Sequence, residues 1–175
     1  VIHAEGGLFL PDFRAGERCF QLLAQVSGRA GRGEKEGVVL VQTMCPDAQP
    51  IARAVEMDYE GFAAAELGAR SALDYPPSGK LARVVFESRD RALAERRARE
   101  VAGQLRSEPG ESGLAVLGPA PAPLARVRQR HRFHLVLKFP CHSDFDAFRG
   151  KLLALEGSRD RRLRILVDVD PYSML

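Results

Sequence analysis

The residues with the clearest potential for chemistry lie at positions 25–32, which read Gln-Val-Ser-Gly-Arg-Ala-Gly-Arg. Arg29 and Arg32 carry planar, permanently charged guanidinium groups that suit phosphate oxygens. An arginine at the γ-phosphate of a nucleotide stabilises the negative charge that develops during hydrolysis. Gly28 and Gly31 are expected to break the preceding helix and to let the backbone approach a ligand closely. A helix end followed by a solvated basic turn would also account for the pattern.

An amphipathic segment precedes this motif and would position it. Residues 17–24 lead into the motif, with apolar side chains at helical spacing at positions 19, 20, 22, 23 and 26. A charged turn follows at residues 33–37, and residues 38–43 then form a β-branched apolar run typical of a buried parallel strand. With the short apolar start of the chain, the order strand, helix, glycine-rich turn, strand indicates part of an α/β layer.

The motif resembles motif VI of superfamily 2 helicases, whose pattern is Gln-x-x-Gly-Arg-x-Gly-Arg. The similarity extends over residues 8–43, 58–77, 116–140 and 165–171, and is weak around residues 87–113 and 141–162. Through these stretches the chain resembles the C-terminal part of the PriA family of bacterial replication-restart helicases, also called primosomal protein N′.

This resemblance implies roles for the residues of the motif. Arg29 and Arg32 would reach across a cleft to the phosphates of ATP bound by the other helicase lobe, and Gln25 would position the γ-phosphate or the attacking water. The full set implied to bind the nucleotide is Glu5, Gly28, Arg29, Gly31 and Arg32.

Glu5 belongs to a second implied motif. Glu5-Gly6-Gly7 resembles the end of motif V, which couples nucleotide state to the grip on DNA, although the family usually has Asp where Glu5 stands. A polar turn after a strand is the alternative interpretation.

The cofactors implied by the family are not expected to be held by this chain alone. The phosphate-cradling loop G-x-x-x-x-G-K-[ST] and the Asp-Glu magnesium motif for ATP and Mg²⁺ would lie upstream. The family's zinc module would also lie upstream, because Cys19, Cys45 and Cys141 have no zinc-site spacing. His142 near Asp144 and Asp146 is interpreted as part of a helix start, so no metal site is predicted. The chain alone is expected to be inactive as an ATPase.

Three regions are predicted, of mixed α/β and α+β class. Residues 1–46 would be the end of a RecA-like helicase lobe 2, with motif VI. Residues 47–77 would be a helical linker, with helices at 48–57 and 58–73 ended by Tyr75-Pro76-Pro77. Residues 78–175 would form a C-terminal domain that binds DNA or partners.

The C-terminal domain is expected to have the element order β-α-β-β-α-β, the split βαβ arrangement. A ferredoxin-like fold is what the resemblance implies. Strands are predicted at residues 80–87, 114–117, 133–139 and 163–169, helices at 90–106 and 144–155, and a stiff proline-rich connector at 118–123.

A row of basic residues precedes the strongest predicted strand. Residues 112–143 hold no acidic side chain but carry Arg126, Arg128, Arg130, Arg132 and Lys138. Alternate arginines on an extended segment would point to one side and suit the phosphates of a nucleic-acid backbone. A solvated face, or a surface that docks on the helicase lobes, is the alternative.

Composition limits the functional class. The 175 residues carry a net charge of +3, and residues 1–60 hold 6 basic and 9 acidic side chains against 20 and 14 in residues 61–175. No apolar run approaches the roughly 20 residues of a membrane span. The chain opens without Met or a signal peptide, so it reads as a fragment, and an odd number of widely spaced cysteines favours a reducing, cytoplasmic setting.

The family resemblance implies an ATP-dependent 3′ to 5′ DNA helicase. Such a protein recognises stalled or branched replication forks and promotes primosome assembly for replication restart. Its implied partners are forked DNA, single-stranded-DNA-binding protein and other primosome proteins. Two alternatives remain open at this point: a non-catalytic branched-DNA-binding and loading factor with a degenerate ATP site, and a protein-docking module.

Overall fold

The computed structural model describes residues 1–30, 37–107, 113–140, 145–156 and 160–174. The chain divides into two compact units, Val1–Ala69 and Arg70–Leu175, which are described separately. The described residues contain five α-helices and a four-stranded antiparallel sheet, so the protein has a mixed α/β fold. No described helix is both long enough and apolar enough to cross a membrane.

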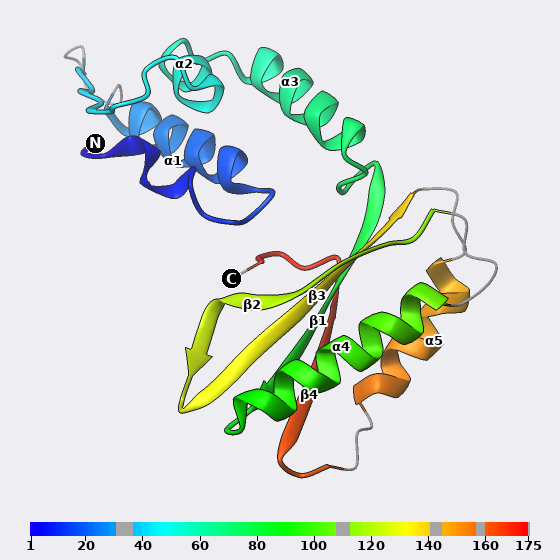
Figure 1. Cartoon of the computed structure of the whole chain (residues 1–175). Helices are drawn as coiled ribbons and strands as arrows, with labels where there is room; N and C mark the ends of the chain where they lie inside the picture. Colours follow the sequence, from blue (N-terminus) through cyan, green and yellow to red (C-terminus); the bar gives the residue numbers. More distant parts are fainter. Residues whose placement is uncertain (31–36, 108–112, 141–144, 157–159, 175) are drawn as a thin grey trace. The chain divides into compact units, whose positions relative to one another are not determined.

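Unit 1 is helical. It contains the 3₁₀ helix η1 (Ala4–Gly7), α1 (Ala15–Ala30), α2 (Gln49–Val55) and most of α3 (Tyr59–Ala72), which continues into unit 2 (Figure 1). The two helices predicted within residues 47–73 are therefore confirmed.

The core of unit 1 is small and centres on one side of α1. The rings of Phe20 and Phe62 stack with centroids 4.2 Å apart, and Leu23, Ile51 and Ala54 pack around them. The start of α1 is fixed by Asp12, whose carboxylate accepts the backbone amide of Arg14 at 3.0 Å and lies 2.9 Å from the Arg18 guanidinium.

The predicted break of α1 at Gly28 is wrong. The helix continues through Gly28 to Ala30, and Gly31 lies outside the described residues. One glycine costs a helix only about 1 kcal/mol relative to alanine, which the packing of the helix can offset.

The predicted strand at residues 38–43 is also wrong. The segment belongs to no described strand, and Val38 and Leu40 are 82% and 80% exposed. Its backbone touches the start of the chain, where the Gln42 amide donates to the Val1 carbonyl at 2.9 Å and the Ala4 amide donates to Gln42 at 3.1 Å. An apolar β-branched run favours extended backbone, but a strand also requires a neighbouring strand, and the described residues of unit 1 supply none.

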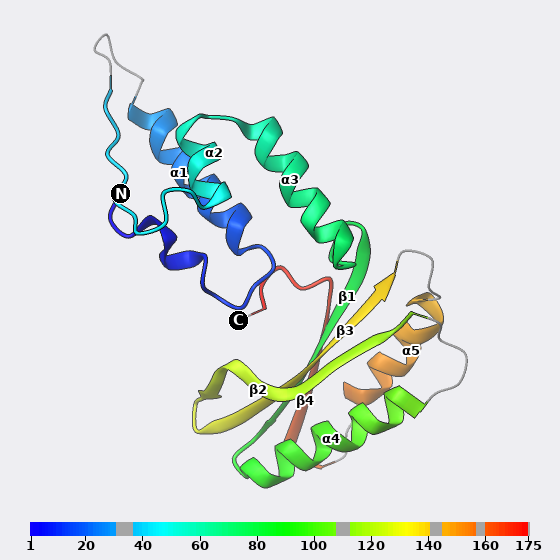
Figure 2. The same cartoon turned by 45° about the horizontal axis from the view of Figure 1, so that its top comes forward.

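Unit 2 has the element order β-α-β-β-α-β, as predicted. Its elements are β1 (Gly79–Ser88), α4 (Arg91–Ser107), β2 (Ala115–Val127), β3 (Arg130–Pro140), α5 (Phe145–Glu156) and β4 (Leu163–Val169). The strands form one sheet in the order β2-β3-β1-β4, and all neighbours are antiparallel (Figures 1 and 2).

The core of unit 2 lies between one face of the sheet and the two helices. Alternate residues of the central strands point into it, because side chains of a strand alternate between faces. The fully buried members from the strands are Ala82, Val84, Phe86, Leu135, Leu137 and Phe139, and those from the helices are Ala94, Ala98, Val101, Ala102, Phe148 and Leu152. Leu93, Val101 and Leu105 of α4, and Phe145, Phe148, Leu152 and Leu155 of α5, contact this core.

Strand β2 is longer than predicted. The expected connector at residues 118–123 is part of it, with irregular pairing to β3 between Leu117 and Ala120 and between Pro121 and Arg126. The alternate prolines are tolerated because β2 is an edge strand, where one side of the backbone needs no amide donors.

Candidate nucleotide and nucleic-acid sites

Three residues of the arginine motif lie on one exposed face of α1. Gln25, Gly28 and Arg29 are all exposed, and their spacing of three and four places them on neighbouring turns. Leu22, 54% exposed, extends the same face toward the start of the helix. Arg32 and Gly31 lie outside the described residues.

Among the residues that the structure describes, nothing crowds the surface at Gly28 and Arg29. A Cβ atom added at Gly28 would meet no other atom within 4 Å, and Arg29 makes no ion pair with a described residue. An amide and a guanidinium on an uncrowded helix face fit one side of a phosphate-binding site. The remaining side of such a site would have to come from another part of a protein.

Glu5 lies apart from this face. Its side chain is buried, and Oε1 lies 3.1 Å from the backbone nitrogen of Met44 and 3.1 Å from Nδ1 of His3. Hydrogen bonds from the Thr43 hydroxyl, from its own backbone amide and from the Met44 amide lower the pKa of Glu5 from 4.5 to about 2, against the opposing effect of burial. The ionised Glu5 side chain therefore connects η1 to the segment after residue 42 through hydrogen bonds. Its implied contact with nucleotide stays a prediction.

The basic row predicted at residues 126–132 does not lie on one extended segment. Arg128 and Gln129 form the turn between β2 and β3, with φ angles of 47° and 64°. Two consecutive residues with positive φ are typical of a tight hairpin turn. The prediction of one row with period two is therefore wrong. The sequence does not reveal this turn, because it lacks the Asn-Gly or Asp-Gly pair that marks most such hairpins.

The hairpin separates the basic residues into two groups. Arg132 is withdrawn from solvent, since its Nε lies 2.9 Å from Glu87 Oε1 and the two side chains are only 11% and 12% exposed. Lys138 lies over the ring of Tyr75, with Nζ 4.6 Å from the ring centroid. The phosphate contacts of these two residues stay a prediction.

His134 lies near Arg132 on the same strand. Burial, followed by the charges of Arg83 and Arg132, lowers the pKa of His134, so the imidazole is neutral at pH 7. It adds no positive charge to this part of the sheet.

Arg126, Arg128 and Arg130 remain at the turn. Arg126 and Arg128 are exposed and Arg130 is partly exposed, and the Arg126 guanidinium donates to Gln129 Oε1 at 2.7 Å. This turn can present guanidinium groups to an anionic polymer.

The sheet brings further arginines beside this turn, which the linear sequence does not reveal. Ser88 pairs with His131 on one side and with Leu163 on the other, so the ends of three strands meet at one end of the sheet (Figures 1 and 2). The arginines added there are Arg89, Arg91 and Arg162. Only the strand pairing identifies them, because they are far from the turn in sequence.

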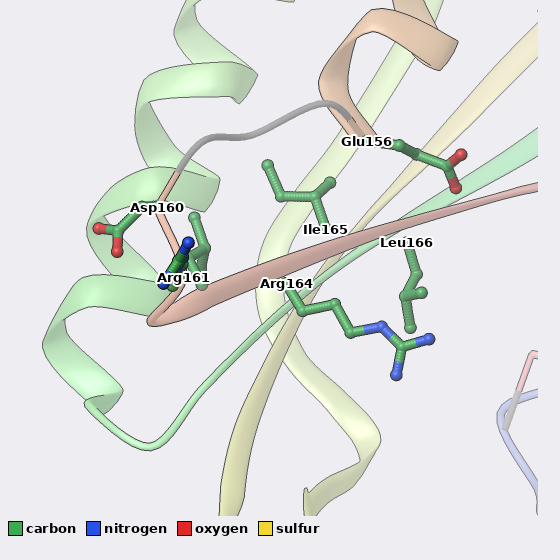
Figure 3. A pocket seen from close by; sticks show the side chains of 7 residues that line it. Glu156, Asp160, Arg161, Arg164, Ile165 and Leu166 are labelled. Atoms are coloured by element: carbon green, nitrogen blue, oxygen red, sulfur yellow. The ribbon is translucent and has the colours of Figure 1, made fainter.

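A hollow of about 470 Å³ lies along the outer edge of β4 (Figure 3). Its lining comes from the end of α5, the segment before β4 and β4 itself: Glu156, Asp160, Arg161, Leu163, Arg164, Ile165 and Leu166. Glu156 Oε1 accepts the Val167 amide at 2.9 Å and so occupies part of the strand edge. The described residues hold no group of three or more metal-ligating side chains, here or elsewhere.

Residues 71–172 match the family described as Primosomal protein N C-terminal domain. The chain belongs to the PriA family and corresponds to the C-terminal portion of its members, as the resemblance read from the sequence predicted.

Relatives named Replication restart protein PriA cover nearly the whole chain. The protein of Bacillus subtilis (strain 168) is 36% identical over 177 residues, which is 100% of this chain and 22% of the relative. That of Synechocystis sp. is 38% identical over 178 residues, 99% of this chain and 20% of the relative. That of Treponema pallidum (strain Nichols) is 42% identical over 180 residues, 98% of this chain and 26% of the relative. The chain therefore spans a fifth to a quarter of the length of these relatives.

Proposed function

We propose that the chain is the C-terminal part of an ATP-dependent 3′ to 5′ DNA helicase that recognises stalled or branched replication forks and promotes primosome assembly. The observation that carries the proposal is the match to PriA proteins over nearly the whole chain, with Gln25 and Arg29 of the motif exposed on one helix face. Forked DNA, single-stranded-DNA-binding protein and other primosome proteins are the proposed partners, in the cytoplasm.

Unit 1 is proposed to complete a RecA-like helicase lobe. Residues 1–46 would be the end of lobe 2, and residues 47–77 the helical linker. The match to PriA proteins over nearly the whole chain supports this assignment, together with Gln25 and Arg29 on one exposed face of α1.

Residues 78–175 are proposed to be a ferredoxin-like C-terminal domain. The sheet order β2-β3-β1-β4, with an antiparallel sheet and one helix in each βαβ half, supports the split βαβ assignment.

The chain's own contribution to ATP hydrolysis would be to hold charge at the phosphates. Arg29 and Arg32 would stabilise the charge that develops on the transferred phosphoryl group, and Gln25 would orient the attacking water. ATP with Mg²⁺ supplies the reacting phosphate anhydride when bound by the complete protein. Zinc does not fit the described residues, which offer no cluster of ligands for it. The zinc module that the resemblance implies is proposed to lie upstream of these residues.

An ATPase measurement tests this role. In a full-length protein with an intact phosphate loop, Arg29→Ala should lower DNA-stimulated turnover by on the order of 10³-fold, the scale of an arginine contact to a transferred phosphoryl group. Gln21→Ala, on the exposed surface of the same helix, is the matched control and should retain wild-type turnover. The purified 175-residue chain should not hydrolyse ATP, and steady turnover by this chain would contradict the assignment to lobe 2.

A DNA-binding measurement tests the turn between β2 and β3. Changing Arg126, Arg128 and Arg130 to Ala should weaken binding to forked DNA and flatten the plot of log K against log[salt] by about 2.7, if each arginine neutralises one phosphate. Changing them to Lys should preserve much of the binding, because a phosphate requires charge more than a planar fork. Normal DNA binding by the Ala variant, with loss of a protein partner, would favour the docking alternative.

A further inference from the structure

We propose that the end of unit 2 beside the β2–β3 turn binds double-stranded DNA by contacting the phosphates of both strands across one groove. This surface, here called the basic end, consists of Arg89, Arg128, Arg130 and Arg162. The inference rests on the proposed role in DNA binding and extends it to one kind of DNA and to two arginines outside the predicted row.

The sheet sets the width of the basic end. Val127 pairs with Arg130 at the turn, and Ser88 pairs with both His131 and Leu163. The strand ends here follow the order β2-β3-β1-β4 (Figures 1 and 2). Arg128 lies in the turn between β2 and β3, Arg130 begins β3, Arg89 follows β1 and Arg162 precedes β4. Three intervals between neighbouring strands, each about 4.8 Å, give a width of about 14 Å. The major groove of B-DNA is about 12 Å wide, so the two sides of the basic end can reach phosphates on opposite sides of a groove.

The acidic residues at this end are already engaged. Asp90 Oδ1 accepts the backbone amides of Ala92 and Leu93 at the start of α4, at 2.9 and 3.2 Å. Glu87 is paired with Arg132. Neither carboxylate forms an ion pair with Arg89 or with an arginine of the turn among the described residues.

Arg162 keeps donors for a phosphate. Asp160 accepts its Nε at 3.2 Å and its Nη2 at 3.1 Å, which uses two of the five donors of a guanidinium. The Arg162 side chain is 76% exposed, and an exposed ion pair of this kind contributes only about 0–1 kcal/mol. A phosphate can therefore bind the outer side of this guanidinium without displacing a buried partner. By contrast, the Arg91 guanidinium carbon lies 6.0 Å from the centroid of the Phe133 ring, and it is left out of the basic end.

The composition of the hairpin favours a duplex over a single strand. Proteins that hold single-stranded DNA stack its bases on aromatic side chains. Residues 115–132 contain no Phe, Tyr or Trp, and the next aromatic residue, Phe133, is buried in the core. Guanidinium groups without a stacking platform suit a backbone held at fixed spacing on both sides of a groove.

The test compares a short blunt duplex with one of its single strands, using the full 175-residue chain and fluorescence anisotropy at several salt concentrations. The turn variant is Arg128→Ala with Arg130→Ala, and the far variant is Arg89→Ala with Arg162→Ala. The matched control is Arg96→Ala with Arg99→Ala, because these residues are 65% and 69% exposed but lie beside Glu100 and Glu95 on α4.

The four arginines of the basic end should contribute about −3.6 to the wild-type duplex slope, and each double variant should halve that contribution to about −1.8. The control should bind like the wild type, and the single strand should bind more weakly than the duplex. Replacing Arg89 and Arg162 by Lys should restore most of the duplex slope, which separates a charge effect from a folding defect.

Two outcomes would overturn the inference while leaving DNA binding by the turn intact. One is a far variant that binds duplex like the control while the turn variant loses affinity. The other is equal binding of duplex and single strand with equal responses to both variants. If neither double variant changes DNA binding, or if the chain binds no DNA, the proposed DNA role of this unit fails together with the inference.

Discussion

Glu5 shows how much of a residue's role depends on its surroundings. A carboxylate before two glycines at the start of the chain reads equally as a turn or as part of a nucleotide-coupling motif. In the structure it is buried and bound to the Thr43 hydroxyl and the Met44 amide, nearly 40 residues away in sequence. The charge of this side chain stabilises the contact between two segments that otherwise share few hydrogen bonds.

The pH dependence of folding should reveal this contact. Because the pKa of Glu5 is lowered from 4.5 to about 2, its contribution to the free energy of unfolding is present above pH 4.5 and is lost as the pH falls toward 2. Glu5→Gln should lower the thermal midpoint of unit 1 at pH 7, and the difference from the wild type should shrink between pH 4.5 and pH 2. Circular dichroism melts over this range measure it.

Glu60→Gln is the control for this measurement, since Glu60 is exposed on α3. Its difference from the wild type should change less with pH than that of Glu5→Gln. An equal response of the two variants would mean that Glu5 makes no special contribution.

The arginines show the same limit of residue-level prediction. Arg128 and Arg132 have similar neighbours in sequence, but Arg128 lies in an exposed turn and Arg132 is paired with Glu87. The sequence correctly places both within a region without acids. It does not reveal the pairing of β1 with β3, which brings Glu87 opposite Arg132.

At the scale of elements, local patterns predict the helices and the central strands well. Their apolar residues have the period of the element and face one core, so α4, α5, β1, β3 and β4 are found close to their predicted bounds. The errors fall where a local pattern competes with context: the glycine within α1, the run at residues 38–43, and the proline-rich half of β2. The packing of α1 offsets the cost of its glycine, the run at residues 38–43 has no neighbouring strand in the described part of unit 1, and β2 tolerates its prolines because it is an edge strand.

Two glycines of unit 2 should respond oppositely to substitution by alanine. Gly103 lies inside α4, and an added Cβ would meet no atom within 4 Å, so Gly103→Ala should stabilise the protein by about 1 kcal/mol. Gly118 has a φ of +95°, and an added Cβ would lie 2.8 Å from the carbonyl oxygen of His134, so Gly118→Ala should destabilise it by about 1 kcal/mol or more. Urea titrations of the two variants measure both effects. Similar changes in the two would show that neither the helix nor the edge strand is formed as described.

At the scale of the whole molecule, each unit has its own core. The core of unit 2 joins four strands and two helices, whereas that of unit 1 depends on a few side chains around Phe20. This difference favours a unit 2 that is stable on its own and a unit 1 of lower stability.

Residues from about 78 to 175 should fold alone. The isolated segment should unfold cooperatively on heating, and Leu137→Ala should reduce its stability by about 2–5 kcal/mol, because Leu137 is fully buried in the core of the sheet. Leu124→Ala is the control, since Leu124 is 51% exposed and its loss should cost far less. A segment that melts without cooperativity would show that unit 2 depends on unit 1.

The extended segment at residues 38–43 has a consequence for handling the protein. Val38 and Leu40 expose apolar side chains on a backbone that joins no described ladder, and such a segment is a template for strands of other molecules. Purified chains at high concentration should therefore aggregate through this segment. A charged residue at position 40 would act as a gatekeeper and raise the solubility of the chain without touching either core.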